Sequence, residues 1–154
     1  MKILLVVLLL AFGSVSIAQC VYCTDINEAL LAPGEVEQLD LSGQGLTEFP
    51  DSLHLFTNLK SLNLSDNRIE SLNFGKAELP YLSKLNLNFN PGLDVINISG
   101  LDKAFPALEA LHLRDCSIFL VSPELGKLKN LTFLDLSNNK LNNLPEGLDD
   151  CSLE

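Results

Sequence analysis

LKSLNLSDNRI, residues 59–69, contains the spacing that predicts the fold of this 154-residue chain. Leucines occupy its first, fourth and sixth positions, asparagine the ninth and isoleucine the eleventh. The same spacing returns from residues 82, 108 and 131, and a looser copy begins at Val36. Successive copies therefore start 23, 23, 26 and 23 residues apart. A period in this range indicates a row of stacked structural repeats.

The centre of each copy alternates apolar and polar residues, which is the period of a β-strand. In the second copy, Leu62 and Leu64 point to one side and Asn63 to the other. A strand of about five residues cannot hold its apolar side out of water alone. Stacked copies bury these sides against one another, so we expect parallel strands in a solenoid.

One position after each strand carries a recurring polar residue. The chain turns inward there, and buried backbone groups need hydrogen-bond partners. An asparagine amide offers two donors and one acceptor oxygen, so stacked amides can bond the neighbouring turns. The column consists of Gln44, Asn67, Asn90, Cys116 and Asn139.

The second half of the repeats is marked by apolar-proline pairs at residues 49–50, 79–80, 105–106 and 144–145. Leu53 and Phe56 follow the first pair at a spacing of three, which favours a 3₁₀ or short helical turn packed on the strands. Proline suits the start of such a turn. The third repeat is longer, and we expect loop bulges at residues 91–92 and 99–103 rather than a loop that grips a partner.

Residues 36–152 resemble the leucine-rich repeat family, in its class with 23-residue copies. The resemblance implies an α/β solenoid with a parallel β-sheet on the concave face and short 3₁₀ or helical turns on the convex face. It places a leucine-rich repeat domain at 36–154, with repeats starting at 36, 59, 82, 108 and 131. Residues 25–50 look like exported bacterial members. The family implies a protein-binding module without catalysis, since its members bind proteins, or less often peptides and glycans, on the concave face.

Residues 1–18 have the pattern of a secretory signal peptide: Lys2, an apolar run over 3–12 and a small-x-small site at 16–18. The rival interpretation, a lipoprotein signal ending at Cys20, fits poorly because Gln19 precedes that cysteine. We predict a secreted, extracellular protein, or a periplasmic or envelope protein in a bacterium. No other segment predicts membrane insertion after signal removal.

Signal removal leaves nine basic and twenty acidic residues, a formal charge of −11. Nucleic acids and anionic membranes attract basic surfaces, so neither is an expected partner. A basic partner or solubility alone fits this charge.

Four cysteines remain, and they allow three pairings. Cys20 and Cys23 are close enough in sequence to pair with each other. We predict a free thiol at Cys116, because its column position is buried. One C-x-x-C pair is weak support for zinc or redox chemistry.

The two ends of the array have different signals. We assign residues 19–35 to an N-terminal cap segment and residues 24–32 to the cap itself. It contains a short helix that Asp25 caps, with Glu28 three residues later. After Leu153 no cap sequence follows. A fragment of a longer array is the favoured explanation, ahead of a poorly covered edge or an end-to-end dimer.

Alternation places the residues that flank the leucines on the concave face. In the first two copies these are small and polar, as on a solvated surface. In the last three, phenylalanines stand outward around a histidine and an arginine, and such residues are enriched at the centres of interfaces. We predict a partner-binding patch of Lys84, Phe89, His112, Arg114, Phe133 and Asp135. The alternative is that the rings lie flat and that His112 and Asp135 form an exposed ion pair of little energetic value.

The chain is not predicted to be an enzyme. His54 falls on an outer turn, and His112 has Asp135 and Ser137 nearby but no oxyanion hole or pocket. No phosphate-binding glycine loop or metal motif occurs, so no catalytic residue, metal or cofactor is predicted. Sequons at Asn63, Asn97 and Asn130 are weak signals, because the repeat itself generates Asn-Leu-Ser.

The leading hypothesis is a secreted or envelope-associated protein-binding module. The alternatives are a structural repeat fragment without a dedicated ligand and cell-surface glycan binding.

Overall fold

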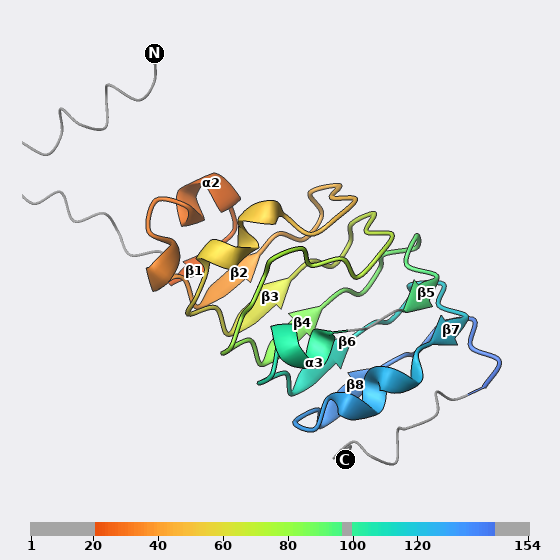
Figure 1. Ribbon diagram of the computed structural model, residues 1–154. Helices are drawn as coiled ribbons and strands as arrows, with labels where there is room; N and C mark the ends of the chain where they lie inside the picture. Colours follow the sequence, from red (N-terminus) through yellow and green to blue (C-terminus); the bar gives the residue numbers. More distant parts are fainter. Residues whose placement is uncertain (1–20, 97–99, 144–154) are drawn as a thin grey trace, which may run out of the picture.

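The computed structural model describes residues 21–96 and 100–143, which build a curved stack of parallel strands (Figure 1). The main sheet has six strands in the order β1-β2-β3-β4-β6-β8. Every strand lies beside the one from the repeat before it, because each turn of the chain returns to the same edge. The strands are β1 (Tyr22–Cys23), β2 (Gln38–Asp40), β3 (Ser61–Asn63), β4 (Lys84–Asn86), β6 (Ala110–His112) and β8 (Phe133–Asp135).

The strand register follows the repeat period and confirms the predicted parallel stacking. Leu39 pairs with Leu62, Leu62 with Leu85, Leu85 with Leu111, and Leu111 with Leu134. The first four of these leucines are buried in one core, and Leu134 packs against it half-buried. The apolar column predicted from the Leu-x-Leu spacing is therefore formed.

The start of the sheet holds one strand that the sequence analysis did not predict. β1 pairs with β2, with Tyr22 opposite Gln38, and extends the sheet by one strand before the first repeat. The predicted cap helix is present as α2 (Ile26–Ala29), and the Asp25 carboxylate accepts hydrogen bonds from the backbone N–H groups of Asn27 and Glu28. A 3₁₀ turn, η2 (Pro33–Glu35), leads into β2.

Short helices cover the outer side of the strands, as predicted. They are η3 (Asp51–Leu55), α3 (Leu101–Ala104) and η4 (Pro123–Lys127). Each contributes a buried leucine to the core: Leu53, Leu101 and Leu125. A second, two-stranded sheet joins β5 (Val95–Ile96) to β7 (Leu120–Val121) at the side of the stack (Figure 1).

The expectation of loop bulges in the third repeat is wrong for residues 101–103. These residues belong to α3, which follows Gly100 in the left-handed conformation. Leu101 and Ala104 are both buried. The longer repeat thus forms a helical turn, because it carries two apolar side chains that the core can accept.

The amide column confirms the prediction for the polar position after each strand. Asn90 donates hydrogen bonds to the carbonyls of Leu64 and Leu87 and accepts one from the N–H of Ile69, at 2.8–3.0 Å. Asn67 and Asn139 make the equivalent bonds. One amide therefore joins two consecutive turns of the chain.

Cys116 takes the column position in the fourth repeat as a buried free thiol, as predicted. Its Sγ lies 3.1 Å from the Leu87 carbonyl and replaces one of the amide bonds. Cys23 is disulfide-bonded. The proposed pairing with Cys20 stays a prediction, because Cys20 and Cys151 lie outside the described residues. The same holds for the signal peptide and for the chain end.

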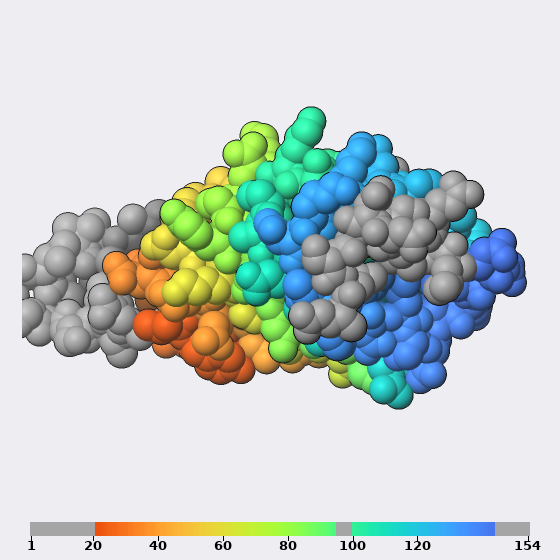
Figure 2. Space-filling view, turned by 90° about the horizontal axis from the view of Figure 1, so that it is seen from below, coloured from red at the N-terminus to blue at the C-terminus, as the bar shows by residue number. Residues whose placement is uncertain are grey.

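The space-filling view shows the repeats as successive bands across the molecule, in the order of the sequence (Figure 2). Each band touches the band before it and the band after it. Any surface that extends across the molecule is therefore assembled from several repeats, which is the geometry of a solenoid.

Candidate functional site on the concave face

One row of side chains crosses the concave face at the last residue of each strand. In four repeats the side chain accepts a hydrogen bond from the backbone N–H two residues later, at 2.9–3.1 Å. Aspartate and asparagine form such Asx-turns readily. The four residues are Asp40, Asn63, Asn86 and Asp135.

His112 is the exception in this row. The backbone N–H of Arg114, two residues later, donates instead to Oδ1 of Asn88 in the preceding repeat, at 2.7 Å. The turn is thus supported from outside its own repeat. The imidazole of His112 is left without the structural role that its four counterparts have.

A second row consists of residues with left-handed backbone conformation, one after each strand. Their φ angles lie between 56° and 67° in Gly43, Asp66, Phe89, Asp115 and Asn138. Glycine, aspartate and asparagine tolerate this region, whereas it is a genuine outlier for a bulky side chain. Phe89 therefore carries backbone strain of about 1–3 kcal/mol.

The strain at Phe89 is not offset by full burial of its side chain. The Phe89 side chain is 50% exposed, and its backbone N–H donates to the carbonyl of Arg114 at 2.9 Å. The residue is thus fixed by the adjacent repeat while its ring faces solvent.

His112 and Phe133 form the other aromatic element of this face. Their ring centroids are 4.8 Å apart, and the ring planes meet at 40°. Phe133 is 47% exposed, whereas His112 is half-buried. The two rings therefore pack together across β6 and β8, so Phe133 lies over a residue of the neighbouring strand.

The expected ion pair between His112 and Asp135 is not formed in the described part of the chain. Burial and the nearby Lys84 ammonium lower the pKa of His112, and Asp135 opposes them only in part. Hydrogen bonds from Ser137 lower the pKa of Asp135, with a smaller contribution from Arg114. Near neutral pH the His112 imidazole is therefore uncharged and lies beside the ionised carboxylate of Asp135.

The remaining charged residues of the predicted patch come from β4 and from the turn that follows β6. Nε of Arg114 is 3.0 Å from Oδ2 of Asp115. Lys84 is exposed at the start of β4. All six predicted residues are thus on the concave face. His112, Phe133 and Asp135 lie together, Phe89 adjoins Arg114, and Lys84 lies two strands from Asp135.

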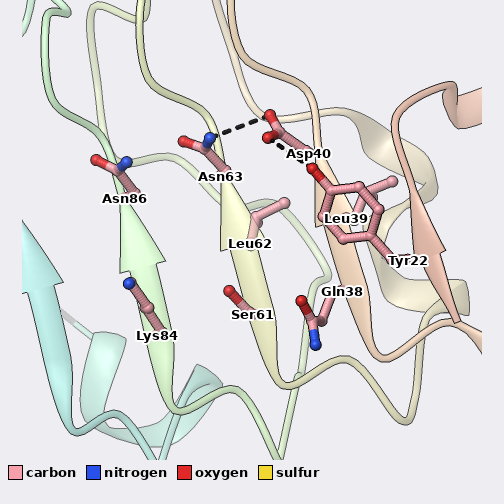
Figure 3. Close-up of a pocket in the computed structure, with 9 residues that line it drawn as sticks. All are labelled: Tyr22, Gln38, Leu39, Asp40, Ser61, Leu62, Asn63, Lys84 and Asn86. Atoms are coloured by element: carbon pink, nitrogen blue, oxygen red, sulfur yellow. Dashed lines mark hydrogen bonds between the residues drawn. The ribbon is translucent and has the colours of Figure 1, made fainter.

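A shallow hollow of about 170 Å³ lies on the same face over β1–β4 (Figure 3). Asp40 is its centre, since its carboxylate accepts hydrogen bonds from the Tyr22 hydroxyl at 3.2 Å and the Asn63 amide at 3.1 Å. Gln38, Ser61, Lys84 and Asn86 complete the polar lining.

Sequence reasoning missed this hollow, because it treated the first two repeats as ordinary solvated surface. Tyr22 supplies the aromatic wall, and it comes from a strand that was not predicted. No sequence signal was available for it, because β1 has only two residues.

Both histidines of the chain lie within residues 21–96 and 100–143. No cluster of three or more histidine, cysteine, aspartate or glutamate side chains could hold a metal ion there. His54 is exposed on η3, with Nδ1 2.6 Å from the Asp51 carbonyl. Over the same ranges, no helix has the length and apolar character needed to cross a membrane.

Two sequons fall on described residues, and the third, at Asn97, lies outside them. Asn63 is half-buried, and its amide donates to Asp40. Asn130 is exposed and donates to the Pro106 carbonyl at 2.8 Å.

The structure is a solenoid, with stacked parallel strands, helical turns outside and an amide column inside. Its open polar face is the kind of surface that solenoids use for binding. The family model Leucine Rich Repeat matches residues 58–76 and 130–151. The chain is similar to the transforming growth factor beta activator LRRC32 of Mus musculus, with 34% identity over 165 residues, 93% of this chain and 24% of that protein. It is also similar to tubulin-specific chaperone E of Xenopus laevis, with 33% identity over 124 residues, 79% of this chain and 22% of that protein.

Among solved structures, internalin C2 of Listeria monocytogenes is similar, with 25% identity and a TM-score of 0.61 over 77% of this chain and 50% of that one. The chain belongs to the leucine-rich repeat family. It spans about a quarter of the length of the two animal relatives named above. The relatives include both animal and bacterial proteins, so the likeness to exported bacterial members stays a prediction.

Proposed function

We propose that this chain is a protein-binding module that uses its concave face between β4 and β8. The binding patch consists of Lys84, Phe89, His112, Arg114, Phe133 and Asp135. In this proposal the chain acts by holding a partner, with no catalysis and no cofactor. Leucine-rich repeat proteins are generally binding modules, which supports the proposal at the level of the family.

The proposal rests on two neighbouring repeats that each carry an aromatic ring at a position where the other repeats have a small or polar residue. Phe89 stands where the other repeats have glycine, aspartate or asparagine, and His112 stands where they have aspartate or asparagine. Phe89 carries backbone strain, the turn after His112 takes its hydrogen bond from Asn88 instead of from residue 112, and both residues place a ring on the same exposed face. Strain of this kind persists where function requires the side chain.

Exposed aromatic rings on a rigid sheet are also typical of the residues that contribute most to binding energy at interfaces. Phe89 and Phe133 together with Arg114 offer the residue types that concentrate binding energy. The backbone beneath them is fixed by strand pairing and by the amide column. A partner would therefore meet a preorganised surface, which lowers the entropy cost of binding.

The chain is further proposed to act outside the cytoplasm, in the extracellular space or in an envelope compartment. The signal-peptide pattern of residues 1–18 and the disulfide at Cys23 support this placement, since disulfides persist in oxidising compartments. Under this proposal the mature chain starts after residue 18, with the cap segment 19–35 and the repeat domain 36–154. N-terminal sequencing of the exported product should begin at Gln19.

A site-specific photo-crosslinker tests the proposed surface. The crosslinking residue p-benzoylphenylalanine replaces Phe133 in one variant and Tyr81, an exposed aromatic residue outside the sheet, in the control. Each is incubated with the native extracellular fraction. A discrete product is expected from position 133 alone, and it should disappear in a second variant that also carries Phe89→Asn. Equal labelling from both positions would contradict a dedicated concave site.

Glycan binding is the second candidate function, and the hollow around Asp40 favours it. An exposed tyrosine ring beside amide, hydroxyl and carboxylate groups can stack on a sugar and hydrogen-bond its hydroxyls (Figure 3). A glycan array probed with the wild-type chain and with Tyr22→Ala tests it. A signal that the variant loses would favour this function over the protein-binding one.

A further inference from the structure

We infer that the partner of the concave face presents a lysine or arginine side chain, which binds against Phe133 and Asp135 with His112 beside it. The inference rests on the proposed function and names the chemistry of the partner. It does not use the hollow around Asp40, which lies over other strands.

Geometry provides the first argument. Phe133 and Asp135 are two residues apart on β8, so both side chains project from the same face of the sheet. The His112 ring packs 4.8 Å from the Phe133 ring. A cation attracted to the face of an aromatic ring would therefore find a carboxylate next to that ring.

The local charges provide the second argument. Across the described ranges, Asp135 has no cationic group within 4.0 Å, whereas the nearby Arg114 is engaged with Asp115 at 3.0 Å. Lys84 lies on β4, with β6 between it and β8. The carboxylate of Asp135 is thus available to a cation that arrives from outside.

The charge of the whole chain points the same way. Ten basic and twenty acidic residues give a formal charge of −10. A field of this sign attracts a basic partner and repels an acidic one. An acidic segment docking on Lys84 would have to overcome that repulsion, so the basic side chain is the occupant that the charges favour.

His112 gives this site a pH dependence of known sign. The groups that face the imidazole are Lys84 from β4, and Asp135 and Phe133 from β8. Because burial and Lys84 lower the pKa of His112, the ring is uncharged at neutral pH and takes up a proton only in acid. The protonated ring would compete with the incoming cation for Asp135, so binding should weaken as the pH falls.

The test uses nuclear magnetic resonance of the full chain, labelled at histidine and phenylalanine. The probes are the blocked peptide acetyl-Gly-Arg-Gly-Gly-amide and its glutamate counterpart. The arginine peptide should produce saturable shifts at His112 and Phe133, and the glutamate peptide should not. Binding should be weaker at pH 5 than at pH 8, and His112→Phe should remove that difference because it keeps a ring without a titrating group.

Asp135→Asn is the decisive variant, since asparagine supports the same turn in Asn63 and Asn86 and should leave the fold intact. We expect it to weaken the arginine peptide about three- to fivefold, the range of an exposed ion pair. Asp51→Asn, an exposed carboxylate on η3, is the matched control and should change nothing.

The inference is overturned if the arginine peptide gives no saturable shift, if the glutamate peptide gives the same shift, or if Asp135→Asn binds like the wild type. Crosslinking at Phe133 distinguishes this failure from failure of the proposed function. A specific crosslinked partner without arginine binding removes the inference alone. Absence of both removes the inference and the protein-binding surface together.

Discussion

The asparagine column is the residue-scale feature that holds consecutive turns of the solenoid together. Asn90 is fully buried, and its amide serves as donor and acceptor to three backbone groups. Leaving such groups unpaired costs far more than the bond itself contributes. This position could be predicted from sequence, because buried backbone turns need a partner wherever the spacing places them.

Asn90→Ala should therefore destabilise the chain by about 3 kcal/mol, since one side chain satisfies several buried groups at once. Urea unfolding followed by circular dichroism measures the change. Asn142→Ala, at an exposed position, is the control and should stay within about 0.5 kcal/mol of the wild type. Equal effects of the two variants would contradict the role of the column.

Cys116 allows a chemical test of the same column. Burial raises the pKa of this thiol, so its reactive thiolate is scarce at neutral pH, and the side chain is fully enclosed. Iodoacetamide should label Cys116 slowly in the native chain and rapidly after unfolding in urea, as measured by mass spectrometry. Native labelling at the rate of an unstructured thiol would show that the column opens at this repeat.

The residues of the candidate site could be predicted only in part. Alternation placed Phe89 and His112 on the concave face, but it carried no information on backbone conformation. The hint that this row is left-handed was the residue type at the equivalent positions, which are Gly43, Asp66, Asp115 and Asn138. The strain at Phe89 and the displaced turn at His112 become visible only when the repeats are compared in three dimensions.

At the scale of elements, the outer turns determine how much apolar side chain each repeat buries against its strand. η3 shows the principle, because its apolar residues alternate in exposure. Leu53 is fully buried, whereas Leu55 in the same helix is 43% exposed. The proline-led spacing of three therefore serves to place one leucine under the strand layer.

Leu53→Ala should cost about 2–5 kcal/mol of stability, because it removes a buried side chain and leaves a cavity. Leu55→Ala, two residues later, should change stability by less than about 1 kcal/mol because nearly half of this residue is already exposed to water. Thermal unfolding of both variants provides the measurement. A Leu55→Ala variant as unstable as Leu53→Ala would show that the helix faces the other way.

Elements without a repeat pattern are the ones that the sequence analysis missed. β1 has two residues, and a strand so short carries no detectable alternation. α3 lies where the third repeat departs from the common period, so copy-to-copy comparison predicted a loop. Both exist because neighbouring repeats give them a partner, which a local pattern does not contain.

At the scale of the molecule, the solenoid is a chain of nearest-neighbour contacts. β3, β4 and β6 have a paired strand on both sides, whereas in the described sheet β1 pairs only with β2 and β8 only with β6. Opening should therefore be easier at the two end strands than in the middle of the stack.

Native-state hydrogen exchange tests whether the end of the stack opens more easily than its middle. The amides of Leu64 and Leu87, which donate to the next repeat at 2.8 and 2.9 Å, should exchange among the slowest in the chain. The Gln38 amide, which bonds β1 through Val21, should exchange faster. Equal protection at all three positions would indicate one cooperative unit rather than a stack of linked ones.

We infer that the Phe89 and His112 rings are kept for binding, at a cost in backbone strain at Phe89, and one double variant tests both parts of this inference. Phe89→Asn combined with His112→Asn introduces the residue that Asn138 and Asn86 provide at the equivalent positions of other repeats. The urea midpoint and the affinity for the partner captured at Phe133 are measured on the same preparation. We predict a chain that is more stable by about 1–2 kcal/mol and binds at least about tenfold more weakly. A variant that binds like the wild type, or that is less stable, would contradict the account.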